Sequence, residues 1–393
     1  MSFLYPAKHT YLQKTLCQEL NQKTVNRLMD ARRPVNVCAK NPFPDLENYE
    51  AHIYAPNVDA TRSKRGFGRW AMPKLRRQIH HPDVQVVAQA VNTILDLVYD
   101  PQYAFQAIRE GVVDRLSDMM LHEMDFIREK ICMILYVLGS HEAGRRVMIR
   151  RYEIIKNLFL LTEDDAEGVR KSAQRVIEMV SRNLIGCVGL NMADGLLLTL
   201  RLIGGSPPAT SDDILALNLR ILEQLLEDDC KLLALKHGAM ETLISKLEHP
   251  REEIVATALS CIAMLCTERE GRKKAIEREL HKLLCKMLHS QSQLIQTKAA
   301  GAITFVTISS EVRGELSNPC IIERLLQMME NFHCPEMQMM AAKTLTNLAE
   351  VITARKFLAI KKTQKRIKMV YTGKDEVVER HKNILLDAIR WEP

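Results

Sequence analysis

Aromatic residues are scarce in this chain of 393 residues: they make up 5% of it, and tryptophan occurs only at Trp70 and Trp391. Hydrophobic residues nevertheless account for 47% of the sequence, which is enough for a large buried core. The apolar content therefore comes mainly from aliphatic side chains, methionine and alanine. This bias favours helix packed on helix over a β-sheet, where aromatic and β-branched residues would be enriched.

Motifs of catalysis and cofactor binding are also missing. Gly66-Phe67-Gly68 lacks the third glycine and the Lys-Ser/Thr pair of a phosphate-binding loop. The ten cysteines include no Cys-x-x-Cys pair, and neither Gly-x-Ser-x-Gly nor His-Glu-x-x-His occurs. We therefore expect no enzyme, no cofactor, no metal site and no small-molecule substrate. Scattered cysteines without such spacing are typical of buried, reduced thiols in a cytosolic protein.

No apolar run is long enough to cross a bilayer, and residues 1–10 lack the pattern of a secretory signal. These features predict a cytoplasmic protein without a membrane partner.

Charge is distributed unevenly along the chain. Residues 1–83 hold 14 Lys/Arg against 7 Asp/Glu, and residues 355–393 hold 11 against 5, whereas residues 84–354 hold 30 against 36. Attraction to an acidic partner is therefore expected from the two basic ends. Residues 355–368 contain seven basic residues, no acid and one aromatic, Phe357. Nucleic-acid binding usually needs a basic stripe with stacking aromatics, so we expect no nucleic acid there. A solvated helix face and a contact with an acidic surface such as tubulin both stay open.

The strongest positive signal is an apolar position that recurs seven times at intervals of 40 to 45 residues. These marker residues are Ile94, Ile134, Val176, Ile221, Ile262, Ile303 and Leu345. The positions four residues before and three residues after each marker are mostly apolar, and such spacing places side chains on one face of a helix. One unit is too small to bury that face alone, so neighbouring units must stack. A period of 40–47 residues is typical of HEAT and armadillo proteins.

Each unit also shows an internal order of polar turn, helix, glycine-containing junction and further helix. Gly111 and Gly238 mark such junctions, where a helix end needs a left-handed or closely packed backbone. Three helices per unit favour the armadillo type. The sequence therefore predicts an all-α, armadillo/HEAT-like right-handed superhelical solenoid of about seven repeats.

Residues 1–65 do not fit the repeat and predict an extended N-terminal arm that binds a partner. Four prolines between Pro34 and Pro56 prevent a long helix, and eight of the twenty aromatic residues occur in residues 1–70. Such aromatics pack either on the chain's own solenoid or on another protein, and the sequence leaves both open. We expect the solenoid over residues 66–354 and a basic C-terminal segment over 355–393, with a capping helix at 377–391.

The candidate partner-binding residues come from the two ends of the chain. They are Phe43, Tyr49, Tyr54, Phe67 and Trp70 near the N-terminus, and Lys361, Lys362, Lys365, Arg366 and Lys368 in the basic run.

Two stretches resemble a known family. Residues 66–75, Gly-Phe-Gly-Arg-Trp-Ala-Met-Pro-Lys-Leu, resemble the start of the radial spoke head 14 homologue family, also called the rhabdoid tumour deletion region protein; Met72 stands where that family has leucine. Residues 95–101, Leu-Asp-Leu-Val-Tyr-Asp-Pro, followed by Ala107, Ile108 and Gly111, look like a second family motif. Residues 298–303 resemble a later repeat.

The resemblance implies a non-catalytic armadillo scaffold in the radial spoke of motile cilia or flagella. Its partners would be other radial spoke proteins, and it would lie in the axoneme, a cytoskeletal structure. The alternative function is a soluble cytoplasmic armadillo adaptor for cargo or assembly. Adaptors that resemble nuclear import receptors hold basic peptides on a ladder of Trp and Asn, and both tryptophans here lie outside the predicted repeats.

Overall fold

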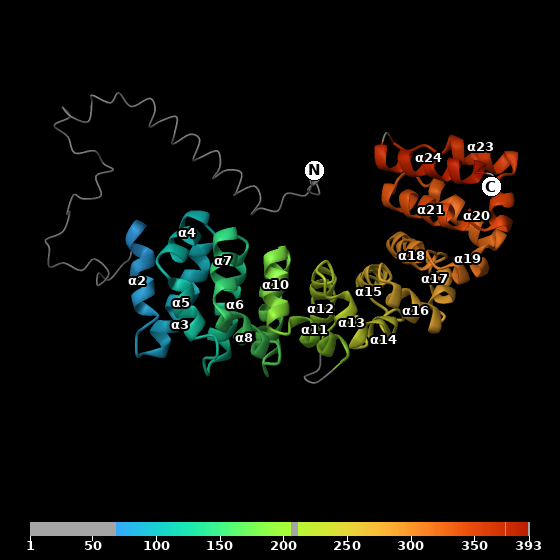
Figure 1. Cartoon of the computed structure of the whole chain (residues 1–393). Helices are drawn as coiled ribbons and strands as arrows, with labels where there is room; N and C mark the ends of the chain where they lie inside the picture. Colours follow the sequence, from blue (N-terminus) through green and yellow to red (C-terminus); the bar gives the residue numbers. More distant parts are fainter. Residues whose placement is uncertain (1–67, 206–210, 374, 392–393) are drawn as a thin grey trace, which may run out of the picture. The chain divides into compact units, whose positions relative to one another are not determined.

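The computed structural model describes residues 68–205, 211–373 and 375–391, which form helices and no strand (Figure 1). The chain divides into two compact units, residues 1–179 and 180–393. The division falls inside one helix, α9 (Glu167–Ser181). The predicted N-terminal arm lies outside the described residues.

Eight helices of 14 or 15 residues recur along the described chain, and pairs of shorter helices separate them. The long helices are α3 (Val84–Val98), α6 (Asp125–Gly139), α9 (Glu167–Ser181), α12 (Asp212–Leu225), α15 (Glu252–Leu265), α18 (Gln293–Val306), α21 (Pro335–Leu348) and α24 (Glu376–Arg390).

The shorter helices have 3 to 12 residues. They are η2 (Gly68–Trp70), α2 (Ala71–Gln78), α4 (Pro101–Arg109), α5 (Val112–Asp118), α7 (Glu142–Arg150), α8 (Tyr152–Leu161), α10 (Leu184–Met192), α11 (Gly195–Ile203), α13 (Lys231–Lys236), α14 (Ala239–Ile244), α16 (Arg269–Glu277), α17 (Leu280–Met287), α19 (Ser310–Leu316), α20 (Pro319–Glu330), α22 (Ile352–Leu358) and α23 (Lys361–Met369).

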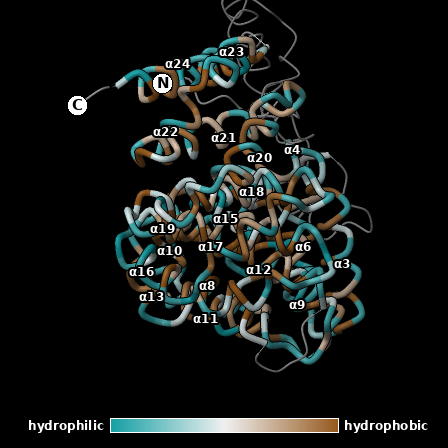
Figure 2. Tube along the Cα trace, turned by 90° about the vertical axis from the view of Figure 1, so that its right-hand side faces the viewer, coloured by the Kyte–Doolittle hydropathy of each residue, from teal (hydrophilic) through white to brown (hydrophobic). Residues whose placement is uncertain are grey.

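All seven marker residues lie on long helices, and each is at most 1% exposed. In the first unit α2 packs on α3, and α3 packs on α6. In the second unit α12, α15, α18, α21 and α24 pack on one another in that order. Apolar and polar stretches alternate along the helices (Figure 2), as expected for helices that bury one face. The recurring apolar position is therefore the face through which neighbouring repeats touch.

A left-handed residue forms the junction between the two short helices in four of the repeats. Gly111 before α5 and Gly238 before α14 have φ of 71° and 79°, as the sequence predicted for these two glycines. Asp194 before α11 and Glu279 before α17 adopt the same region at φ of 60° and 51°. A left-handed conformation strains a residue with a Cβ atom, so packing of the repeats fixes these two junctions.

Close approach of the next helix fixes the end of several long helices. A Cβ atom on Gly271 of α16 would lie 1.9 Å from the carbonyl oxygen of Leu265, at the end of α15. Gly144 and Gly186 would meet the end of the preceding long helix at 2.0 and 1.9 Å. Only glycine fits at these three positions.

After α6, α15 and α21, an arginine of the next short helix donates hydrogen bonds to backbone carbonyl oxygens at the end of the long helix. Arg272 donates to the carbonyl oxygens of Cys266 at 2.9 Å and Thr267 at 2.7 Å. Arg145 and Arg355 make the corresponding bonds after α6 and α21. The last carbonyls of a helix have no partner within it, so these arginines cap it.

The repeats extend further than the sequence predicted. Helices α22, α23 and α24 repeat the order short, short, long, and α24 agrees with the capping helix expected at 377–391. The boundary predicted at 354 falls inside α22, so residues 352–390 continue the stack of helices. Leu386 of α24 is buried 41 residues after Leu345, and Lys382 lies four residues before it. The Lys382 ammonium bonds the Val370 carbonyl oxygen at 3.3 Å.

Within the described residues no single helix is long and apolar enough to cross a membrane. The pair α10 and α11 meets that criterion jointly by length and composition, and its two helices are bent by 85° relative to each other.

We expect Gly271→Ala to destabilise the second unit, because its methyl group would overlap the Leu265 carbonyl oxygen. Steric overpacking of this kind costs about 1–3 kcal/mol. Gly314→Ala in α19 is the matched control, since no atom lies within 4 Å of its added Cβ atom. The control should be neutral or stabilising by up to about 1 kcal/mol, because alanine favours helix over glycine. Urea unfolding of the full chain compares the two; equal stability would contradict the close approach.

Candidate protein-binding surface

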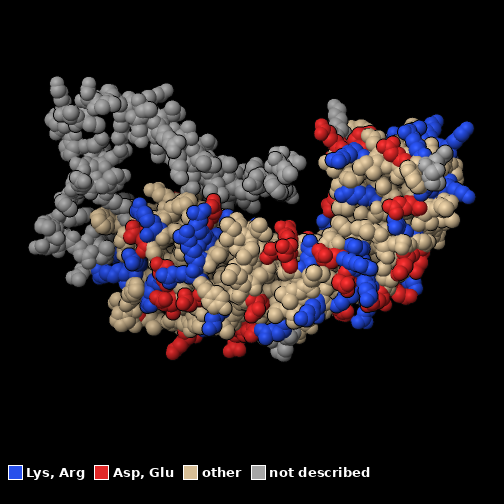
Figure 3. Space-filling model, in the orientation of Figure 1, with Lys and Arg blue, Asp and Glu red and all other residues tan. Residues whose placement is uncertain are grey.

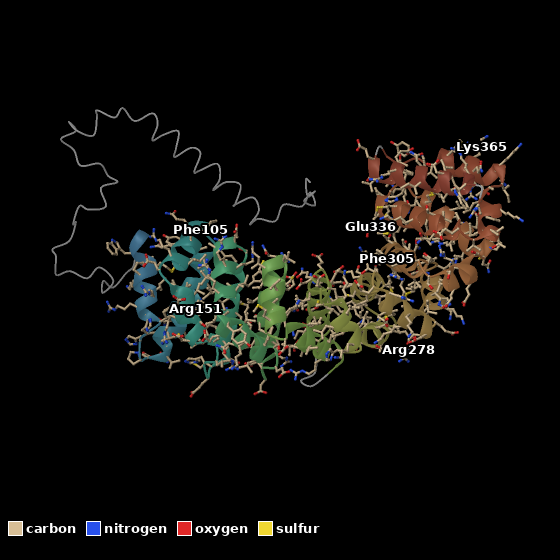
Figure 4. All side chains as sticks on the ribbon, viewed as in Figure 1. Phe105, Arg151, Arg278, Phe305, Glu336 and Lys365 are labelled. Carbon is tan, nitrogen blue, oxygen red and sulfur yellow. The ribbon has the colours of Figure 1, made fainter. Side chains whose placement is uncertain are left out.

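The long helices of the second unit lie side by side along its concave side. The shorter helices α16, α17, α19 and α20 lie on the opposite, convex side of this unit (Figure 1). We define the inner face by side chains of α12, α15, α18 and α21 that point away from the buried markers. Figure 4 shows two of its residues, Phe305 of α18 and Glu336 of α21.

One row of the inner face is formed by the residues two positions after the markers. In order along the helices it contains Glu223, Met264, Phe305 and Asn347, all half-buried. Met264 and Phe305 pack partly against the core of the second unit and leave part of their surface exposed. The row therefore presents an acid, two large apolar side chains and an amide to any molecule that lies across the helices.

The amide of this row is used within the chain. Asn347 Nδ2 donates to the Thr304 carbonyl oxygen at 2.9 Å and to Thr307 Oγ1 at 3.0 Å. Thr304 Oγ1 lies 2.8 Å from Thr344 Oγ1, and both threonines are buried. These bonds join α18 to α21, so Asn347 serves packing between repeats. A ladder of Trp and Asn is not present on the inner face, in agreement with the sequence.

Ionic contacts also join successive long helices. Lys298 Nζ of α18 lies 2.8 Å from Glu336 Oε1 of α21. Arg251, which precedes α15, binds Asp213 of α12 through Nη1 at 2.7 Å. Both pairs are partly exposed, so each contributes little to stability and mainly fixes the side chains.

The inner face carries more acids than bases around Glu223. Burial raises the pKa of the Glu223 carboxyl; a hydrogen bond from Ser260 and the charge of Lys298 oppose the rise, whereas Glu227 and Glu336 add to it. Glu227 and Glu336 thus repel the ionised carboxylate of Glu223, and the positive charge of Lys298 partly offsets this repulsion. The arrangement favours a ligand that brings a positive charge.

Four of the five candidate residues at the N-terminal end lie outside the described residues. They are Phe43, Tyr49, Tyr54 and Phe67. Trp70 is half-buried in η2, directly before α2.

The five candidates in the basic run lie on α23, and they differ. Lys361, Lys362, Lys365 and Lys368 are exposed. Arg366 is half-buried and bound within the chain: its guanidinium contacts Glu323 and Glu330 of α20, each at 2.9 Å. The structure therefore separates four available lysines from an arginine that holds α23 to α20.

Sequence reasoning missed the inner face. Its signal was present, because Glu223, Met264 and Phe305 recur at intervals of 41 residues in step with the markers. They were not singled out because a recurring position that mixes acid, thioether and aromatic residues has no common chemistry.

Within the described residues there is no group of three or more His, Cys, Asp or Glu side chains that could hold a metal ion. Several cysteines lie deep in the core. Burial raises the pKa of the Cys132 and Cys266 thiols to about 12, which leaves them protonated at neutral pH. Of the eight described cysteines five are buried as expected, whereas Cys285 and Cys334 are half-buried and Cys320 is exposed.

No protein-family model matches the chain. Solved structures do resemble it. An engineered protein aligns with 81% of this chain and 78% of its own at a TM-score of 0.71 and 17% identity. A designed armadillo repeat protein in complex with the peptide (KR)4 aligns with 60% of this chain and 99% of its own, at a TM-score of 0.54 and 17% identity.

A structure that describes a phosphorylation switch in the interaction between cadherin and beta-catenin aligns with 81% of this chain and 60% of that one. Its TM-score is 0.63 and its identity 17%. Identities this low establish the fold alone. The chain is an all-α armadillo-type solenoid, as the period of the marker residues predicted.

We expect Lys298→Met to destabilise the chain more at pH 7 than at pH 4. The raised pKa of Glu223 means that its ionised form costs stability above that pKa, and the cost disappears when the carboxyl is protonated at low pH. Loss of Lys298 increases the cost and also breaks the pair with Glu336. The difference between the two pH values should be roughly 0.5–1 kcal/mol, given the partial exposure of these groups.

Lys286→Met, at an exposed position of α17, is the matched control. Urea unfolding of both variants and the wild type at the two pH values makes the comparison. Losses of equal size at pH 7 and pH 4 for Lys298→Met would rule out this role of Glu223.

Proposed function

We propose that this protein is a non-catalytic scaffold that binds segments of other proteins along the inner face of its second unit. The observation that carries the proposal is the row Glu223, Met264 and Phe305, in which two large apolar side chains stay partly exposed and the Glu223 carboxyl lies near two further carboxylates, with Lys298 as the cation that acts on it. An extended segment that crosses the helices would bury the two apolar groups. Burial of such anchors supplies most of the affinity at protein interfaces.

The chemistry of the inner face favours a segment with basic residues. A Lys or Arg side chain near Glu223 would offset the repulsion among Glu223, Glu227 and Glu336. The designed armadillo protein bound to (KR)4 offers an analogy for this mode of binding, at the level of the fold.

We propose further that the scaffold belongs to the radial spoke of motile cilia or flagella, where other spoke proteins are its partners. The support is the resemblance of residues 66–75 and 95–101 to that family. In the structure, residues 95–101 join α3 to α4: Asp100 Oδ1 accepts from the Gln102 amide at 2.8 Å, and Pro101 is the first residue of α4. These are favoured residues for a helix start, so the motif shapes a repeat junction.

Within the axoneme, the acidic surface of tubulin is the partner that we expect for the basic C-terminal residues. The alternative, a soluble cargo adaptor of the import-receptor type, is less well supported. The row on the inner face contains a single asparagine, Asn347, and that asparagine is used within the chain.

The test is expression of the tagged chain in multiciliated cells that lack the endogenous protein. The wild type should enter axonemes and be extracted by salt together with radial spokes. Phe305→Ala should remain folded but lose spoke proteins from its immunoprecipitate, because the apolar anchor of the inner face is gone. Phe126→Ala, which removes a 40% exposed phenylalanine from α6, is the matched control and should behave as wild type.

The outcomes separate the two parts of the proposal. Absence of the wild-type chain from axonemes contradicts the spoke location. Full recovery of spoke proteins with Phe305→Ala contradicts the role of the inner face.

A further inference from the structure

We propose that α23 is a docking surface for a glutamate-rich segment of a partner protein. Its lysine stripe, which we define as Lys361, Lys362, Lys365 and Lys368, gathers on the exposed side of this nine-residue helix. Figure 3 shows Lys and Arg side chains concentrated over this end of the second unit, and Figure 4 places Lys365 there.

The helix geometry accounts for the stripe. Thr363 and Ile367 are buried and fix which side of α23 faces the fold. Successive residues are about 100° apart around a helix, so the four lysines cover roughly 120° of the opposite side. Each ammonium group therefore points to solvent, while Thr363 and Ile367 pack the other side of α23 against the fold.

The stripe has no acid of its own. Among the described residues none of the four lysines forms an ion pair, although acids lie nearby on α20. Glu323 and Glu330 are both engaged by Arg366, whose guanidinium contacts each at 2.9 Å. Arg366 thus fixes α23 and offsets one of the two negative charges of this pair of acids, and the four lysines form no ion pair with either.

Carboxylates suit this surface better than nucleic acid. Arginine is the residue favoured for phosphate recognition, and the one arginine of α23 is already occupied. Single-stranded nucleic acid also needs aromatic side chains for stacking, and α23 has none.

A membrane surface is a poor match too. A helix that lies on a bilayer inserts its apolar face, but the apolar face of α23 is buried in the fold through Ile367. On the exposed side Met369 is the one large apolar residue of α23, 72% exposed. The surface can therefore attract an anionic partner by charge but offers little to insert.

The size of the stripe limits the partner segment. Nine helical residues span about 13 Å, which corresponds to about four residues of extended chain. A segment with several neighbouring glutamates can place its carboxylates along the four lysines. Exposed ion pairs are weak individually and screened by salt, so the contact should be moderate in affinity and salt-sensitive.

This inference deepens one part of the proposed function, the contact of the basic C-terminal residues with an acidic surface, and it rests on that part alone. It does not require the inner face to bind anything. A glutamate-rich peptide tests the lysine stripe directly, whereas microtubules test tubulin as its partner, so the two can fail separately.

The experiment measures binding of a fluorescent peptide of ten glutamates to the full chain at low and at physiological salt. Replacement of Lys361, Lys362, Lys365 and Lys368 together by alanine should weaken binding by about tenfold or more at low salt, because four weak ion pairs are lost. Alanine favours helix and the positions are exposed, so the variant should keep its melting temperature.

The control replaces four exposed lysines of α13, α16 and α17 by alanine, namely Lys236, Lys273, Lys282 and Lys286. It removes the same net charge from elsewhere in the second unit and should bind within about twofold of wild type. Equal weakening in both variants would mean that net charge alone attracts the peptide and would overturn the proposal. So would absence of binding, or tighter binding to duplex RNA or to phosphatidylserine vesicles than to the peptide.

Stabilised microtubules, with and without their acidic tails, form the second arm. Binding that needs both the tails and the lysine stripe would support tubulin as the partner. Peptide binding without microtubule binding would leave the stripe in place and remove tubulin from the proposed function.

Discussion

Within each unit of this protein, long helices bury one face against neighbouring long helices, α3 against α6 in the first unit and α12, α15, α18, α21 and α24 in series in the second, and the rest of the structure depends on that contact. The burial of Ile221, Ile262, Ile303 and Leu345 in the second unit replaces a single central core by a core that is shared between neighbours. Glycines in the short helices that follow let these helices approach the ends of the long helices closely, and arginines satisfy the carbonyls left there. Stability is therefore a property of adjacent repeats together.

The same arrangement creates the two candidate surfaces. Because one side of each long helix is buried, its other side forms the inner face, where Met264 and Phe305 lie near the acids around Glu223. Because Arg366 ties α23 to α20, the lysines of α23 are held on the outside of the stack. The partners proposed for the two surfaces therefore differ in charge, a basic segment for the inner face and an acidic one for the lysine stripe.

The fold could be predicted from the sequence because the markers recur with a period and report burial directly. The order of helices continues past the boundary expected at residue 354, with Leu386 buried in α24. The long side chain of Lys382 lets its ammonium reach the Val370 carbonyl oxygen while the carbon chain is buried. The lysines of α23 were predicted from their charge. The pairing of Arg366 was not, because its acids lie 36 and 43 residues away in sequence. The inner face depends on which side of each helix is buried, and this follows from the packing.

Hydrogen exchange on Ile262→Asp tests the shared core most directly. The substitution places a charge in a site that is fully buried between α12 and α18, and an uncompensated buried charge costs several kcal/mol. The account predicts loss of amide protection in α12, α15 and α18 together, while Ile352→Asp, at a 66% exposed position, leaves protection unchanged. Loss confined to α15, or protection equal to that of the wild type, would contradict a core shared between repeats.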